Sequence, residues 1–108
     1  MAIPHARPGE PLEIRPLGAE LPGSQTTTLI KTDSLEVIRL VVPAGKEIAE
    51  HRVPGEITVQ CIEGKVAFHA GEAERELTGG TLMYLAGSTP HSLRGIEDAS
   101  LLLTILLR

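Results

Sequence analysis

The chain has 108 residues, 42% of them hydrophobic, with 10 Lys and Arg against 14 Asp and Glu and a formal net charge of −4. This length predicts a single domain over residues 1–108, and the scattered basic residues argue against a nucleic-acid-binding protein. One cysteine excludes an internal disulfide framework, and neither an apolar leader nor a membrane-length apolar run is present, so we expect a cytoplasmic protein that does not bind membranes.

The sequence predicts short strands nearly throughout, and no helix longer than about two turns. Residues 1–11 are rich in proline and predict an extended arm. Beyond the arm, β-branched and apolar runs alternate with Gly and Pro, which is typical of an all-β sandwich or closed barrel. Glu63-Gly64 predicts a tight hairpin, because Gly accepts a positive φ. The predicted strands are Leu12–Leu17, Thr26–Thr32, Leu35–Val42, Glu56–Ile62, Lys65–Ala70, Ala73–Leu77, Thr81–Leu85, His91–Ile96 and Ala99–Leu107.

The last predicted strand is apolar on both faces, since Leu and Ile fill all positions of Leu101–Leu107 except Thr104. A strand buried on both faces needs a cover on each side. In so small a protein we expect the second cover to be another subunit, and therefore a homodimer. The alternative is that the outer leucines pack under the N-terminal arm.

Two histidines occupy distinctive positions, because His51 and His91 each follow a turn and lie next to a predicted strand. Residues that enter strands from turns lie at barrel mouths, where ligand sites form. Neutral imidazole is the commonest metal ligand, and two imidazoles from separate strands can converge inside a barrel. Taken alone, each is more often an ordinary polar residue. His5 and His69 are expected to be structural or solvated, and Cys61 to be a small buried hydrophobe.

The spacing of these residues resembles the cupin family (RmlC-like). Gly45, His51 and Gly64 fit its first motif, G-x5-H-x-H-x3,4-E-x6-G, and Gly80 and His91 fit its second, G-x5-P-x4-H-x3-N. The resemblance covers about residues 35–107 and implies a jelly-roll β-barrel. It also implies a divalent transition metal (Fe, Zn, Ni or Mn), which the family typically holds with two His and a Glu from the first motif and one His from the second.

The departures from the motifs reduce this ligand set to His51 and His91. Val53 stands at the second His, Ile57 at the Glu, and Ala86 and Gly95 at the Pro and Asn of the second motif.

Two facings of the strand Glu56–Ile62 are possible. In a regular strand Ile57 and Val59 face inward, and they would line a pocket together with Val53, Met83 and Leu85. A bulge after Gly55 would reverse the strand and turn Glu56 and Gln60 inward as tentative ligands.

The expected function is therefore a small stand-alone cupin whose pocket binds a divalent metal weakly through two histidines. A metal-dependent dioxygenase or isomerase of a small molecule fits this site, because two imidazoles leave most coordination positions open. Another possibility is that a histidine acts as an acid or base without metal. The alternative from another class is a non-catalytic module that binds or senses a small ligand without metal, since one fold hosts many functions.

Overall fold

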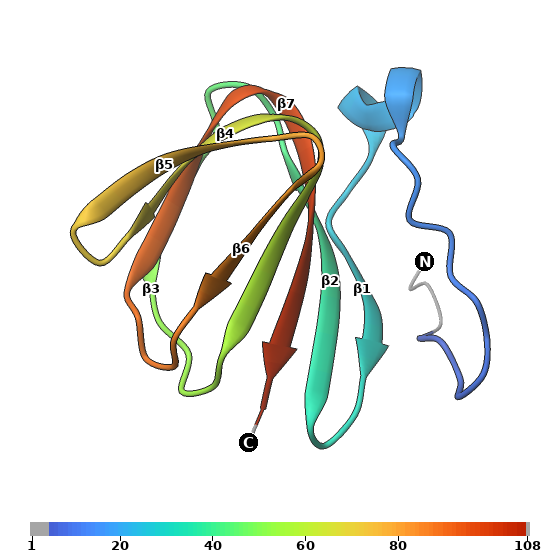
Figure 1. Cartoon of the computed structure of the whole chain (residues 1–108). Helices are drawn as coiled ribbons and strands as arrows, with labels where there is room; N and C mark the ends of the chain where they lie inside the picture. The colour runs from blue at the N-terminus through green and yellow to red at the C-terminus, as the bar shows by residue number, and fades with distance from the viewer. Residues whose placement is uncertain (1–4, 108) are drawn as a thin grey trace.

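The computed structural model describes residues 5–107, so residues 1–4 of the expected arm and Arg108 lie outside the described part. The described chain is almost entirely β (Figure 1), as expected, and its one helix is a six-residue 3₁₀ helix. No helix in residues 5–107 is long and apolar enough to cross a membrane. The elements are η1 (Gly18–Gly23), β1 (Thr27–Lys31), β2 (Leu35–Val42), β3 (Glu47–His51), β4 (Ile57–Ala70), β5 (Ala73–Thr78), β6 (Thr81–Leu85) and β7 (His91–Leu106).

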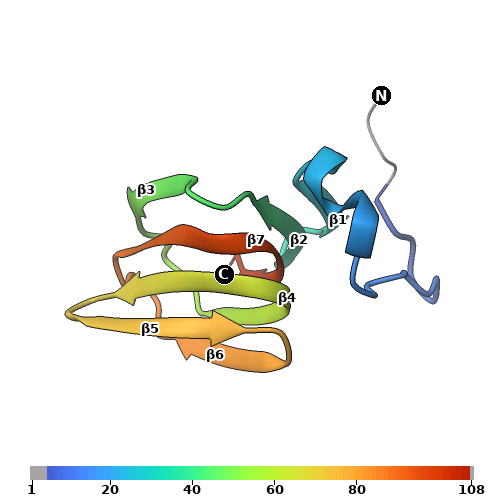
Figure 2. The ribbon, with the colours of Figure 1, turned by 90° about the horizontal axis from the view of Figure 1, so that it is seen from above.

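The seven strands form one antiparallel sheet that folds over on itself, as the view from above shows (Figure 2). The long strands β4 and β7 pair along most of their length and belong to both walls. The first half of β4 pairs with β6, and the second half pairs with β5. Likewise β3 pairs with the start of β7, and β2 pairs with its end. One wall is therefore β1-β2-β7-β4-β6 and the other is β3-β7-β4-β5, which is a jelly-roll barrel.

The hairpin predicted at Glu63-Gly64 is wrong, because β4 runs through both residues without turning back. The pairing of β4 with β7 shifts register at this point, and Gly64 has φ +83°. A Cβ built on Gly64 would lie 2.0 Å from the carbonyl oxygen of Asp98 on β7. Glycine here marks a bulge where a continuous strand bends from one wall to the other. The last two predicted strands are likewise one strand, β7.

Two further expectations about elements are wrong. Residues 12–17, predicted to be a strand, have no regular secondary structure and continue the arm. Conversely, β3 was not predicted, because four of its five residues are exposed and its sequence, EIAEH, does not alternate as a half-buried strand does. Pairing with β7 makes this polar segment a strand, so tertiary contacts override the local sequence signal.

The interior between the two walls is filled almost entirely by aliphatic side chains. The largest fully buried ones come from β2, β4 and β7 and include a single aromatic ring, that of Phe68. Cys61 has no exposed surface, as expected for a small buried hydrophobe, and burial raises the pKa of its thiol. On β7, Leu101 is fully buried and Leu103 packs on the core, whereas Leu106 is 40% exposed.

Candidate functional site

His51 and His91, the two histidines predicted to form a site, lie side by side. His51 ends β3 and His91 begins β7, and their Cα atoms are partners across the antiparallel pair. Facing residues of such a pair have Cβ atoms about 5 Å apart, so their side chains meet. The ring centroids are 4.3 Å apart and the ring planes are tilted by 59°. The register shift between Ile48 and His51 sets this pairing.

Backbone carbonyls hold both rings by the same nitrogen. His91 Nδ1 lies 2.9 Å from the carbonyl oxygen of Thr89, and His51 Nδ1 lies 3.2 Å from that of Ala49. A carbonyl can only accept, so Nδ1 carries the proton in each ring and Nε2 keeps its lone pair. Hydrogen bonds of this kind fix the tautomer and orientation of metal-binding histidines.

The two imidazoles differ in their exposure. His91 is 6% exposed and its ring stacks on Phe68, with centroids 5.9 Å apart and planes within 12°. His51 is exposed at the end of its strand. Nearby, the turn before β7 is joined to the segment before β4, because the Ser88 amide donates to the Val53 carbonyl over 2.8 Å. The pair thus has one imidazole held in the barrel wall and one open to solvent.

This donor set fits a divalent metal ion incompletely. Two Zn–N bonds of about 2.1 Å place two nitrogens at most about 4.2 Å apart on one ion, which the spacing of these rings allows. Within residues 5–107, however, no group of three His, Cys, Asp or Glu side chains could hold an ion. The residues present can therefore supply two imidazole ligands, and a third ligand must come from outside this set of side chains.

The tentative ligands Glu56 and Gln60 are not brought to the histidine pair. In β4 the buried positions are Ile57 and Val59, so Gln60 lies on the opposite face. Glu56 is exposed and lies just before β4 begins. The strand keeps regular inward alternation at these positions, and the reversal that a bulge after Gly55 would cause does not occur.

The residues expected to line a pocket belong to the apolar interior. Ile57, Val59 and Leu85 are at most 5% exposed, and Val53 and Met83 are partly buried against the same core. His69 lies elsewhere, lining a polar hollow of about 300 Å³ on the outside of the β3-β7-β4-β5 wall.

Sequence reasoning missed a polar cluster that fixes the N-terminal segment (residues 5–17) to the barrel. Arg39, on β2, is 7% exposed, and its guanidinium donates to the Arg15 and Glu13 carbonyls over 2.9 and 3.4 Å. Glu63 accepts from the Leu17 amide over 2.8 Å and from the buried hydroxyl of Ser100 over 2.5 Å.

Burial alone would raise the pKa of Glu63, but the hydrogen bonds from Ser100 and from two backbone amides, together with Arg39, lower it below the ordinary value. The sequence carries no distinct signal for this cluster, because β2 and β4 also contain other charged residues, Glu36 and Lys65.

Comparison with known proteins gives structural likenesses only. No family model matches the chain, and no curated protein matches it. A cupin superfamily protein from Desulfitobacterium hafniense superposes with a TM-score of 0.78 at 14% identity, covering 95% of this chain and 100% of that one. A conserved protein of unknown function from Streptococcus pyogenes superposes with a TM-score of 0.76 at 19% identity, covering 100% of this chain and 96% of that one. A predicted oxalate decarboxylase from Thermotoga maritima superposes with a TM-score of 0.69 at 19% identity, covering 77% of this chain and 79% of that one.

Identities this low establish the fold and leave activity open. An RmlC-like cupin from Shewanella frigidimarina also superposes, with a TM-score of 0.75 at 19% identity, covering 98% of this chain and 93% of that one. The bent β4 and β7 shared by both walls, together with these superpositions, show that the chain is a small domain with the RmlC-like cupin fold.

Proposed function

We propose that this protein binds a divalent transition metal ion through Nε2 of His51 and Nε2 of His91 at the end of the barrel. The observation that carries the proposal is the cross-strand pair itself, with centroids 4.3 Å apart and both Nδ1 atoms engaged by backbone carbonyls. Such a pair presents two lone pairs without any change of tautomer. Iron, zinc, nickel and manganese all accept imidazole ligands.

The proposed site is weak and open. Structural zinc sites use four protein ligands and catalytic ones three, whereas this site supplies two imidazoles. Water or a small oxygen-bearing molecule would complete the coordination, which makes the ion a docking point for that molecule. One structural neighbour is named a predicted oxalate decarboxylase, which supports a role with a small molecule and does not identify the substrate here.

We favour ligand binding over catalysis as the primary role. A dioxygenase or isomerase needs groups that move protons or orient a substrate. In residues 5–107 no carboxylate and no third imidazole joins the pair in a cluster suited to an ion, so the bound ion and the two histidines would have to do all the chemistry. The alternative, a ligand-binding module without metal, draws support from the apolar residues Val53 and Met83 beside the core.

Calorimetric titration of untagged protein with Ni²⁺, Zn²⁺, Mn²⁺ and anaerobic Fe²⁺ tests the proposal. His51→Ala should lower the affinity at least tenfold without unfolding the protein, because His51 is exposed. His69→Ala, which removes an imidazole from the outer face, is the matched control and should bind like the parent. Acidification should weaken binding, because protonated imidazole has no lone pair to donate.

Equal metal affinity in the parent and in His51→Ala would refute the two-histidine site. No metal binding to the parent at millimolar concentration would refute it as well. Small-molecule binding that persists in excess chelator would then favour the metal-free module.

A further inference from the structure

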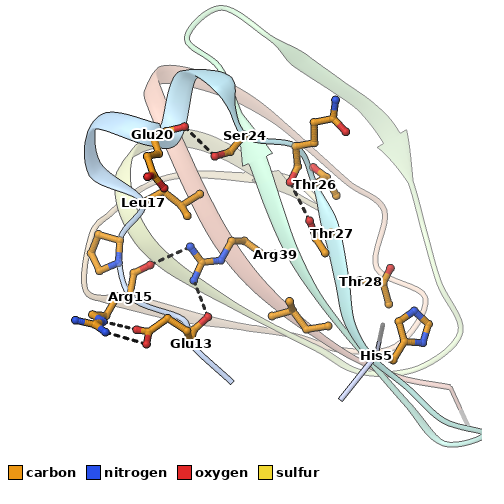
Figure 3. A pocket seen from close by; sticks show the side chains of 13 residues that line it. His5, Glu13, Arg15, Leu17, Glu20, Ser24, Thr26, Thr27, Thr28 and Arg39 are labelled. Carbon is orange, nitrogen blue, oxygen red and sulfur yellow. Dashed lines mark hydrogen bonds and ion pairs between the residues drawn. The ribbon is translucent and has the colours of Figure 1, made fainter. Parts of the chain in front are cut away.

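A second candidate binding site lies outside the barrel, between the N-terminal segment and the edge of the β1-β2 wall. The space there has a volume of about 840 Å³, within the range of small-molecule pockets. One side is formed by residues 24–29 leading into and along β1, and the other by Glu13, residues 15–17 and Glu20. We call this space the arm groove. Figure 3 shows the side chains that line it, with Arg39 between the segment and β1.

Arg39 gives the arm groove a cation with spare hydrogen-bond donors. Its guanidinium has five N–H groups, and the two hydrogen bonds found for it go to the carbonyls of Glu13 and Arg15. Within residues 5–107 no carboxylate oxygen lies within 4 Å of it, and no buried side-chain nitrogen or oxygen lacks a partner. Nε, for which no hydrogen bond is found within the same residues, is therefore not sealed in the protein without a partner.

The two carboxylates that influence Arg39 electrostatically are already engaged. Glu63 accepts from the amides of Leu17 and Gly18 and from Ser100. Glu13 forms an exposed ion pair with Arg15. Arg39 as a residue is only 7% exposed and has no direct counter-ion in the described part of the chain, and a bound carboxylate accepting from its guanidinium would supply one.

The rest of the lining includes four hydroxyl groups, and its one aromatic side chain is that of His5. Thr27 is the Cα partner of Arg39 across the β1-β2 pair, and both residues line the groove. The Thr27 hydroxyl donates to the Gln25 carbonyl over 3.1 Å and still has lone pairs to accept with. Glu20 and the Gln25 amide also line the groove. A flat aromatic ligand would find only the His5 ring to stack on, whereas a chain of hydroxyl groups would find several donors and acceptors.

We propose that the arm groove binds a small polyhydroxylated carboxylate. Its carboxylate would accept from Arg39, and its hydroxyl groups would hydrogen-bond with Thr27, Gln25 and Glu20. The site is separate from the histidine pair, which is built on the other wall by β3 and the start of β7, so the two proposals can fail independently.

Nuclear magnetic resonance titration of ¹⁵N-labelled protein tests this inference with gluconate as the probe and sorbitol as its neutral counterpart. Gluconate should bind with a dissociation constant below about 10 mM and shift amide signals of residues 13–17, 24–29 and 39. Sorbitol, in which a hydroxymethyl group replaces the carboxylate, should bind at least tenfold more weakly. Equal binding of both compounds, shifts confined to other surfaces, or no binding of gluconate at 50 mM would each overturn the proposal.

Two variants assign the residues. Arg39→Met should abolish gluconate binding, although it also removes the contacts to the N-terminal segment. Thr27→Val leaves those contacts intact and should lower the affinity for gluconate at least threefold. Thr78→Val, at an exposed position of β5, is the control and should not change this affinity. If Arg39→Met does not fold, the Thr27→Val result decides. Unchanged affinity in Thr27→Val, or in folded Arg39→Met, would refute the site.

Discussion

Glu63→Gln tests whether a single carboxylate holds the N-terminal segment against the barrel. Glu63 Oε2 accepts from the Leu17 amide over 2.8 Å and from the Ser100 hydroxyl over 2.5 Å, while Oε1 accepts from the Gly18 amide over 3.0 Å. Glutamine has nearly the same shape but a single acceptor oxygen. Its NH₂ group must face at least one of the amides or hydroxyls that now donate to the carboxylate.

The expected loss follows from these bonds. A hydrogen bond to a charged group contributes about 1.5–3 kcal/mol. The substitution removes one or two such bonds at a partly exposed site, so the free energy of unfolding should fall by about 2–3 kcal/mol. For a domain of this size, 1 kcal/mol shifts the midpoint by roughly 4–8 °C. The melting temperature should therefore fall by about 10–20 °C, while Glu76→Gln, an exposed position on β5, should change it little.

The same carboxylate sets a pH dependence. Because the pKa of Glu63 is lowered in the folded state, its contribution is complete above the unfolded pKa, about 4.3, and is lost as the pH falls through the folded value. Thermal melts followed by circular dichroism should show the gap between parent and Glu63→Gln at pH 7 and a smaller gap below pH 4. Limited proteolysis should cut the N-terminal segment faster in the variant. Equal melting temperatures at pH 7, or a gap that widens in acid, would refute the anchoring role.

Three further predictions concern packing, reactivity and assembly. Gly64→Ala should lower the free energy of unfolding clearly more than Gly45→Ala. Both glycines have φ +83°, but a Cβ at Gly64 would lie 2.0 Å from backbone, whereas a Cβ at Gly45 would face open space. Equal denaturation midpoints would contradict the close approach at Gly64. Cys61 should be inert to a thiol reagent until the protein unfolds, because burial raises its pKa; rapid labelling of native protein would contradict this. The homodimer stays a prediction, supported by the exposed side chains of Leu82 (69%) and Leu106 (40%). Light scattering should find Leu82→Asp or Leu106→Asp to be monomeric, and a monomeric parent protein would refute the prediction.

The barrel was predictable from the sequence, but the path of its strands was not. The composition of runs such as Leu35–Val42 predicts a strand, and the structure has a strand there with the same bounds. A glycine next to a polar residue indicates a departure from regular structure, as at Glu63-Gly64. It does not distinguish a hairpin from a bend within one strand. The distinction depends on β7, whose backbone approaches Gly64 from 34 residues further along the chain. Long-range contacts of this kind are not encoded in local spacing.

The candidate site was only partly predictable, again because local spacing does not encode long-range contacts. The turns before His51 and His91 suggested that both lie at one end of the barrel, and the structure makes them cross-strand partners. The facing of Glu56 depended on whether the strand bulged, which the sequence left open. Arg39 is invisible to pattern reading, because a charge in an apolar strand normally indicates solvent. Its burial arises only when the N-terminal segment returns to supply two carbonyls.

The two proposed sites are linked through β7, because Ser100 on this strand holds Glu63 and thereby the N-terminal segment, yet they should act independently. His91 opens this strand on the β3 wall, whereas Ser100, which holds the arm through Glu63, lies nine positions later on the β2 wall. Nine residues of strand span roughly 30 Å, and the strand bends between them at the register shifts with β4. Sites that share no contacts and lie more than about 10 Å apart have nearly additive effects. Because gluconate itself chelates divalent metal ions, the test uses metal-free protein: gluconate should bind the parent and His51→Ala with the same affinity. A large difference would show that the bend in β7 couples the two walls.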